Sequence, residues 1–115
     1  MSVSASEERF FDFKDEVKEA LEENKPVVVL ESTLISHGFP YPENLVVSRE
    51  MEEIIRGYGV VPATIAIIKG KIKIGLTRDE LEFMATSKDI LKASRRDLAV
   101  IAAKGLNGAT TVAAR

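Results

Sequence analysis

The feature that most constrains the fold is an apolar run at residues 27–30, VVVL, which ends abruptly at Glu31, Ser32 and Thr33. Three of its four residues are β-branched and Pro26 precedes them, a pattern that favours a strand over a helix. An apolar run without alternation is typical of a strand buried on both faces in the parallel sheet of an α/β protein. We therefore expect a buried strand with Glu31 at its carboxyl end.

Helical spacing of apolar residues marks two further segments. In residues 15–23 the apolar positions share one face, which predicts a short amphipathic helix. From residue 47 onward, apolar positions recur at intervals of four, three, one and three residues, which predicts a helix over roughly residues 43–56. We assign this second apolar stripe to the core. Its members are Val47, Met51, Ile54, Ile55 and Tyr58.

The middle of the chain has the pattern of a β-hairpin. Residues 64–68 and 71–74 are rich in isoleucine, and only Lys69 and Gly70 separate them. Two such runs joined by a two-residue turn with glycine predict an antiparallel pair of strands. The alternation of lysine and isoleucine in the second run predicts one buried and one solvated face.

The last third of the chain has two signals for helix starts. Thr77 with Glu80, and Ser94 with Asp97, have the spacing of capping boxes. Taken together, the elements follow the order helix, strand, helix, hairpin, helix, helix, which is typical of an α/β fold. We expect a mixed β-sheet with flanking helices.

Composition narrows the functional classes. The 115 residues are 45% hydrophobic, which fits one globular domain, and we expect residues 1–14 to be flexible. Sixteen basic and eighteen acidic residues, with no long basic block, argue against nucleic-acid binding. No stretch approaches the roughly 18 apolar residues of a membrane span. The absence of cysteine removes disulfides and thiolate chemistry and is compatible with the cytoplasm.

The polar residues after the first strand form a candidate site. Ligands of open α/β sheets bind outside the carboxyl ends of the strands, where Glu31 is expected. The polar residues just behind it are Ser32, Thr33, Ser36 and His37. The alternative is that Glu31 only caps the next element or meets solvent. His37 is the only histidine, which excludes a multi-histidine metal centre. A lone histidine beside a glycine is either a hydrogen-bonded loop residue or a catalyst, and the first is the more common case.

Two later segments are candidates for ligand binding. Arg95 and Arg96 occupy the first turn of an expected helix, where the helix dipole disfavours positive charge. Either an anion binds there, or both side chains point outward and pair with surface carboxylates. Residues 107–112, NGATTV, combine glycine and hydroxyl residues ahead of an expected helix. Such a segment lets main-chain amides approach a ligand, or it is only a turn and a helix cap.

Four segments resemble the signature of the pseudouridine-5′-phosphate glycosidase family, also known as the indigoidine synthase A-like family. They are residues 30–42 (LESTLISHGFPYP), 61–67 (VPATIAI), 92–98 (KASRRDL) and 107–114 (NGATTVAA), in the family's order and approximate spacing. Family members are much longer, and the resemblance covers only their amino-terminal part. We therefore expect residues 1–115 to be the amino-terminal part of a single domain, with a fold that is incomplete relative to the full family fold.

The resemblance implies an activity and roles for individual residues. The implied reaction is reversible cleavage of the carbon–carbon glycosidic bond of pseudouridine 5′-phosphate to uracil and ribose 5-phosphate. Glu31 matches the proton donor, so we expect its carboxyl group to be buried at the strand end, where the protonated form is favoured. Lys92, Val112, Thr111 and His37 match positions at the substrate site, with Thr110 beside them.

The resemblance also implies parts that these residues do not supply. A manganese ion would be held by an aspartate beyond Arg115, and the lysine that attacks the sugar would lie there too, so we expect no metal ligand within the chain. A small-molecule nucleotide substrate, a homo-oligomer, specifically a homotrimer, and a cytoplasmic location are implied as well. The alternative is a truncated, non-catalytic binding or assembly module without that lysine and aspartate.

Overall fold

The computed structural model describes residues 10–94 and 97–110. These residues form a mixed sheet flanked by helices, which confirms the expected fold class. In chain order the elements are β1 (Phe11–Phe13), α2 (Asp15–Glu22), β2 (Val27–Leu30), the π-helix η1 (Leu34–Gly38), α3 (Glu43–Gly57), β3 (Val61–Ile68), β4 (Lys71–Ile74), α4 (Arg78–Thr86), β5 (Leu91–Ala93), α5 (Leu98–Ala103) and β6 (Gly108–Thr110). No helix in this part of the chain is both long and apolar enough to cross a membrane.

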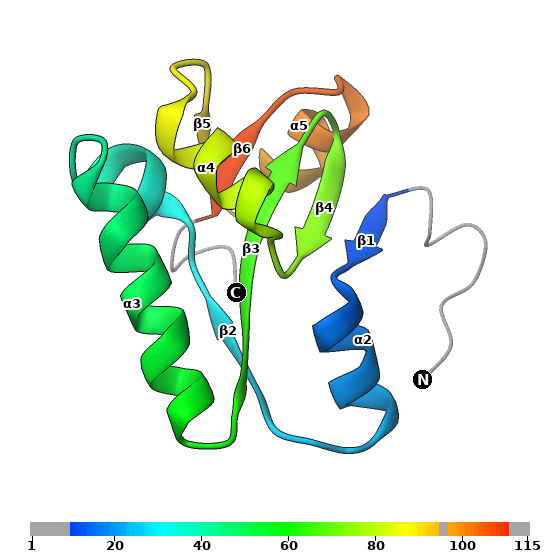
Figure 1. Cartoon of the computed structure of the whole chain (residues 1–115). Helices are drawn as coiled ribbons and strands as arrows, with labels where there is room; N and C mark the ends of the chain where they lie inside the picture. Colours follow the sequence, from blue (N-terminus) through cyan, green and yellow to red (C-terminus); the bar gives the residue numbers. More distant parts are fainter. Residues whose placement is uncertain (1–9, 95–96, 111–115) are drawn as a thin grey trace.

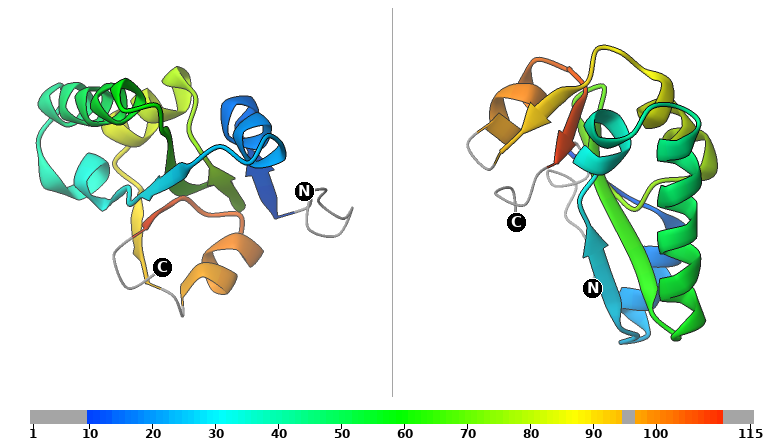
Figure 2. Two further views of the ribbon diagram at one scale, coloured as in Figure 1. Left: turned by 90° about the horizontal axis from the view of Figure 1, so that it is seen from below. Right: turned by 90° about the vertical axis from the view of Figure 1, so that its left-hand side faces the viewer.

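Strand β3 organises the sheet, whose order is β1-β4-β3-β6-β5, with β2 also paired to β3 (Figure 1). Its first half pairs in parallel with β2, from Val27 opposite Val61 to Leu30 opposite Thr64. Its second half pairs antiparallel with β4 and with β6. Helices α2, α3 and α4 lie on one face of the sheet and α5 lies on the other (Figure 2).

Consecutive residues of β3 point into two separate apolar clusters. Ala66 faces the larger cluster, which includes Leu76 and Met84, and Ile67 faces a smaller one with Ala93 and Ile101. All six side chains are at most 4% exposed. The two-residue period of a strand thus builds a core on each side of the sheet.

The expected hairpin is confirmed. Ile68 lies opposite Lys71, and the two turn residues Lys69 and Gly70 have positive φ angles of 49° and 81°. A Cβ atom at Gly70 would lie 2.7 Å from the carbonyl oxygen of Ala102, so glycine is needed for space as well as for conformation. The capping box of Thr77 and Glu80 at the start of α4 is also confirmed.

The expectation that β2 is buried on both faces is wrong. Val28 is 41% exposed and Val29 is 50% exposed. Among the described strands β2 pairs only with β3, so its other edge has no neighbour there. The apolar run was correctly predicted to form a strand. How deeply the strand is buried depends on its neighbours, which the run itself does not specify.

The assignment of the apolar stripe of α3 to the core is also wrong. Met51, Ile54 and Tyr58 are 39%, 63% and 83% exposed, and Val47 and Ile55 are half-buried. The face turned inward instead carries Asn44, Leu45, Ser48 and Glu52. Its polar side chains are satisfied by specific partners: the Asn44 amide, for example, donates to the carbonyl oxygens of Ile35 (2.7 Å) and Ala85 (2.9 Å).

Three short strands were not predicted. β1, β5 and β6 have three residues each, too few for a periodic pattern to be recognised. β1 lies in residues 10–14, which were expected to be flexible, and its parallel pairing with β4 holds it in place. Asp12 of β1 pairs with Lys73 of β4, so Lys73 is half-buried rather than on a solvated face.

Candidate functional site

The carboxyl ends of three strands meet beside the middle of β3. β2 ends at Leu30, opposite Thr64. β6 runs in the opposite direction along β3, with Ala109 opposite Ala66. Its end therefore approaches the end of β2, and the two ends meet at neighbouring positions of β3. β5 is parallel to β6 and ends with Ala93 opposite Thr110. The topology therefore brings together the segments that follow β2, β5 and β6.

Ser32 and Thr110 join two of these segments directly. The Thr110 backbone N–H donates to Ser32 Oγ (2.9 Å), and the Ser32 backbone N–H donates to Thr110 Oγ1 (3.3 Å). Thr33 Oγ1 adds a bond to the Thr110 carbonyl oxygen (2.6 Å), and Thr110 Oγ1 donates to the Ile65 carbonyl oxygen (2.8 Å). Ser32 is 0% and Thr110 is 5% exposed, so water does not compete with these bonds.

Glu31 is held beside this junction by its neighbour Ser32, but the expected burial of its side chain is wrong, because Glu31 is exposed. It lines a cavity of about 90 Å³ together with Leu30, Leu34, Ile35, Ser48, Met51 and Thr64. Within residues 10–94 and 97–110, no side chain hydrogen-bonds or ion-pairs with its carboxylate. The carboxylate is therefore available to a ligand seated on this largely apolar hollow.

Lys92 lies in β5, opposite Ala109 of β6 and one residue before the pair formed by Ala93 and Thr110. Its side chain is exposed, whereas that of Ala93 is buried. The structure thus brings the strand that carries Lys92 to the junction. No ion pair joins Lys92 to Glu31 in the described part of the chain.

The other expected site residues are placed less closely or lie elsewhere. His37 is exposed in the last turn of η1 and does not line the Glu31 cavity. Arg95, Arg96, Thr111 and Val112 lie outside the described residues, as does the helix expected after Thr110. Ser94 and Asp97 interact directly, because Asp97 Oδ2 accepts hydrogen bonds from Ser94 Oγ (2.7 Å) and from the Ser94 backbone N–H (3.1 Å).

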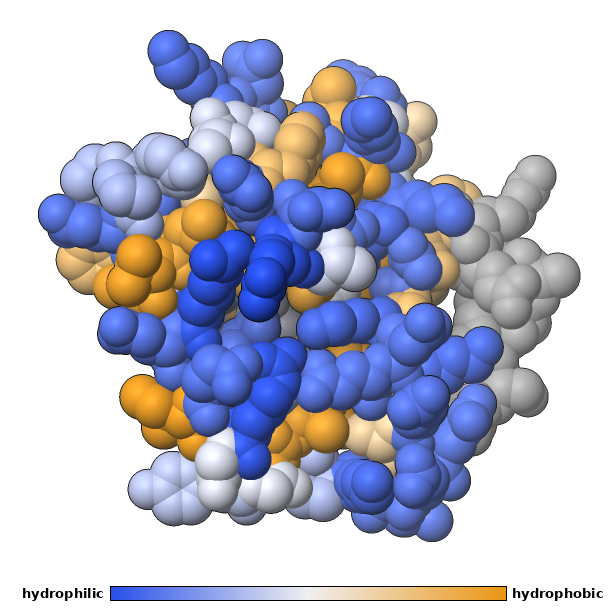
Figure 3. Space-filling view, viewed as in Figure 1, coloured by the Kyte–Doolittle hydropathy of each residue, from blue (hydrophilic) through white to orange (hydrophobic). Residues whose placement is uncertain are grey.

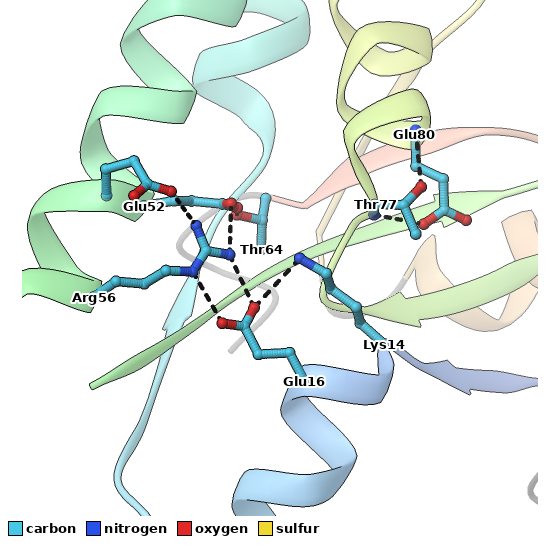
Figure 4. A network of polar contacts seen from close by, with 8 residues as sticks. Lys14, Glu16, Glu52, Arg56, Thr64, Thr77 and Glu80 are labelled. Carbon is cyan, nitrogen blue, oxygen red and sulfur yellow. Dashed lines mark hydrogen bonds and ion pairs between the residues drawn. The ribbon is translucent and has the colours of Figure 1, made fainter. Parts of the chain in front are cut away.

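A partly buried polar network that reaches the cavity through Thr64 was missed from the sequence. Thr64 lines the cavity, and its hydroxyl donates to Glu52 Oε2 on α3 (2.7 Å). Arg56 approaches the other oxygen of Glu52 at 3.5 Å and forms two 2.9 Å bonds to the Glu16 carboxylate (Figure 4). The signal was present as polar residues at every fourth position of α3: Asn44, Ser48, Glu52 and Arg56.

Paired charges stabilise one another in this network. The hydrogen bonds from Arg56 lower the pKa of Glu16, and those to Glu16 raise the pKa of Arg56. Arg56 therefore remains a cation at any ordinary pH and keeps a positive charge beside Glu52, which is only 5% exposed.

Among the described residues, no three histidine or acidic side chains lie close enough together to hold a metal ion. The donors present there do not fit a complete divalent-metal site.

Comparisons with known proteins agree with this architecture. The chain is 69% identical over 106 residues to the pseudouridine-5′-phosphate glycosidase of Caldanaerobacter subterraneus subsp. tengcongensis. The matched segment covers 92% of the chain and 34% of that protein. It is 66% identical over 105 residues to the enzyme of the same name from Petrotoga mobilis, covering 91% of the chain and 34% of that protein. The chain therefore spans about a third of the length of these relatives.

Solved structures share the fold. A prealnumycin C-glycosynthase in complex with ribulose 5-phosphate superposes with a TM-score of 0.80 at 42% identity, over 91% of this chain and 33% of that one. An indigoidine synthase A-like protein from Thermotoga maritima gives a TM-score of 0.75 at 36% identity, over 91% of this chain and 34% of that one. The family described as indigoidine synthase A like protein matches residues 16–115. The chain therefore belongs to the indigoidine synthase A-like protein family.

Proposed function

We propose that the chain supplies part of the active site of a pseudouridine-5′-phosphate glycosidase, which reversibly cleaves the carbon–carbon glycosidic bond of pseudouridine 5′-phosphate to uracil and ribose 5-phosphate. The single observation that carries the proposal is the junction of Ser32 with Thr110, which fixes Glu31 beside the ends of β5 and β6. The names of its relatives support the substrate, and a neighbour that is a C-glycosynthase with bound ribulose 5-phosphate supports C-glycoside chemistry on a sugar phosphate.

In this proposal Glu31 is the proton donor. When the bond between the sugar and the base breaks, its electron pair stays on the uracil carbon, which takes a proton from the Glu31 carboxyl group. A lysine amine bonded to the opened sugar carries the electron deficiency left on the sugar carbon as an iminium ion, and water then releases ribose 5-phosphate. We place that lysine outside these 115 residues, in agreement with the family resemblance.

Lys92 is proposed to bind the charged substrate, with Thr111, Val112 and His37 around it. The position of Lys92 in β5, one residue from the pair formed by Ala93 and Thr110, supports its role. A base seated on the cavity beside Glu31 would contact Leu30 and Met51 and exclude water from the carboxylate. His37 is the least supported of these residues, because it is exposed and lines no part of that cavity.

Several properties of the complete enzyme are proposals of the same kind. We propose manganese as the divalent ion, held by an aspartate outside these residues, and a cytoplasmic location. We also propose a homo-oligomer, specifically a trimer. Exposed apolar side chains on α3, among them Ile54 and Tyr58, support association. Sedimentation analysis of the complete polypeptide tests the trimer, and a monomeric species at micromolar concentration contradicts it.

Uracil release tests the catalytic proposal. The complete polypeptide that contains this chain is assayed with pseudouridine 5′-phosphate and manganese, with Glu31→Gln as the variant. We expect a loss of turnover of at least about a hundredfold, with substrate binding retained, because only proton transfer is removed. Glu50→Gln is the matched control, since Glu50 is exposed on α3 and lines none of the cavities described. Activity within tenfold of the parent in Glu31→Gln contradicts the role of Glu31.

The second candidate is a non-catalytic binding or assembly module. The exposed apolar side chains of β2 and α3 favour it, because surfaces of this kind associate with other polypeptides. The two candidates differ in the behaviour of the 115-residue chain when it is mixed with a separately produced carboxyl-terminal part of the enzyme. Restored uracil release favours the active-site part, and association without release favours the module.

A further inference from the structure

A second cavity, of about 340 Å³, lies between α3 and α4 and is lined largely by charged side chains. Four are cations, Lys14, Arg49, Arg56 and Arg78, and two are carboxylates, Glu52 and Glu53. Figure 3 shows the most hydrophilic side chains of this face gathered between these two helices. Leu76 and Leu81, which are 1% and 4% exposed, complete the lining.

The charges of this cavity are only partly balanced. The Arg56 guanidinium group forms ion pairs with Glu16, Glu52 and Glu53. Lys14 forms an ion pair with Glu16. Arg49 and Arg78 line the same hollow, and neither guanidinium group has a hydrogen bond or ion pair with any residue the structure describes.

The two unpaired arginines come from different elements. Arg49 lies on α3, and Arg78 is the first residue of α4, where the helix dipole adds further positive potential. Two guanidinium groups that line one hollow repel each other, and an anion bound between them would reduce this repulsion. A planar guanidinium fork matches the oxygen atoms of a phosphate group, to which it can donate two hydrogen bonds.

We propose that this cavity, with Arg49 and Arg78 as its anchors, binds a small phosphate-bearing anion. Its volume lies at the lower end of the range of about 300–1,000 Å³ that is typical of small-molecule sites. The opposing carboxylates of Glu52 and Glu53 are already engaged by Arg56, so they compete less with an incoming anion.

This site is separate from the one beside Glu31. The two cavities share no lining residue, but the hydrogen bond between Thr64 and Glu52 lies between them, since Thr64 lines one and Glu52 lines the other. An anion bound at the arginines would therefore lie in the same cavity as the Glu52 carboxylate, which accepts the hydrogen bond from Thr64. The inference rests on the charges and the cavity alone and does not depend on the proposed glycosidase activity.

Titration of the 115-residue chain with inorganic phosphate and with pyrophosphate tests the inference, with two-dimensional NMR as the readout and chloride at matched ionic strength as the reference. We expect saturable shifts of the Arg49 and Arg78 amide signals. Arg49→Ala and Arg78→Ala should each weaken binding by about tenfold. Lys104→Ala, which removes one charge from an exposed residue beyond α5, should change it by less than about twofold.

Three results overturn the inference. They are the absence of saturable binding, an affinity that is unchanged in both arginine variants, and an equal loss in Lys104→Ala, which would show only a general attraction of anions to positive charge. Circular dichroism of each variant shows that its fold is retained. Because both arginines are exposed and unpaired, their removal leaves no buried partner without a hydrogen bond.

Discussion

Ser32 and Thr110 bind each other through reciprocal hydrogen bonds, in which the backbone N–H of each donates to the side-chain hydroxyl of the other across 78 residues of sequence. Both residues are buried, and each follows or ends a strand that pairs with β3. The link fixes the relative position of the first and the last part of the described chain, and the candidate site is built around it.

Removal of either hydroxyl should therefore destabilise the chain. In Ser32→Ala the Thr110 N–H loses its acceptor, and in Thr110→Val the Ser32 N–H loses its acceptor, so we expect each variant to lose about 1–3 kcal/mol in urea unfolding. Thr86→Val is the control, because Thr86 is exposed at the end of α4, and it should change stability by less than about 0.5 kcal/mol. If the two losses add in the double variant within about 0.3 kcal/mol, the residues are not coupled.

The ion pair between Glu16 and Arg56 predicts a pH dependence of stability. Its hydrogen bonds lower the pKa of Glu16 below the ordinary value of 4.5, so the carboxylate stabilises the fold above that value. This contribution is lost as the pH falls through the lowered pKa. The parent should be more stable than Glu16→Gln at pH 7, and the difference should shrink below about pH 4.5.

Thermal unfolding between pH 3 and pH 7 measures this difference. Glu19→Gln is the matched control on the same helix, because Glu19 is exposed and its side chain has no partner in the described part of the chain. A stability difference between the parent and Glu16→Gln that stays constant across this pH range would show that the ion pair contributes nothing.

The two faces of α3 should respond to substitution in the opposite way from what hydrophobicity alone suggests. Asn44→Ala leaves the carbonyl oxygens of Ile35 and Ala85 without their donor in a buried position, at an expected cost of about 2–3 kcal/mol. Ile54→Ala should cost less than about 0.5 kcal/mol, because Ile54 is 63% exposed. Chemical unfolding at a concentration where the chain is monomeric gives both values, and the reverse order would contradict the observed orientation of α3.

Gly70 should be sensitive to the addition of a single methyl group. Gly70→Ala places a Cβ atom 2.7 Å from the Ala102 carbonyl oxygen at a φ of 81°, so we expect a loss of more than about 1 kcal/mol. Gly57→Ala is the matched control, because no atom lies within 4 Å of its Cβ position. There we expect a change of about zero or a small gain in melting temperature, since alanine favours the helix. Equal melting temperatures for the two variants would contradict the close approach of the turn to α5.

The sequence was sufficient for elements whose pattern is local. The hairpin of β3 and β4, the capping box at Thr77 and the helical periods of α2 and α3 all depend on spacings of a few residues. The fold class followed from the order of these elements. The spacing of residues within a segment does not show which other segments will pack against it. This explains why Val28 and Val29 were wrongly assigned to the core.

The orientation of α3 was missed for a related physical reason. An apolar stripe normally turns inward because its burial removes surface from water, but Asn44 and Glu52 have specific buried partners that come from elsewhere in the chain. Those partners are known only once the chain is folded. The strand end at Glu31 was predicted, whereas the exposure of Glu31, the strand β6 in place of a turn at Thr110, and the part played by Thr64 were not.

The end-to-end meeting of β2 and β6 along one edge of β3 has a steric consequence. Leu30 lies opposite Thr64, and Ala109 lies opposite Ala66, so only Ile65 separates the two pairings and neither strand can extend along that edge by more than one residue. Each chain must therefore bend out of the plane of the sheet as soon as its strand ends. The opening beside Glu31 is thus enforced by crowding on a shared strand edge, and insertion of a single residue into either strand would displace the backbone that frames it.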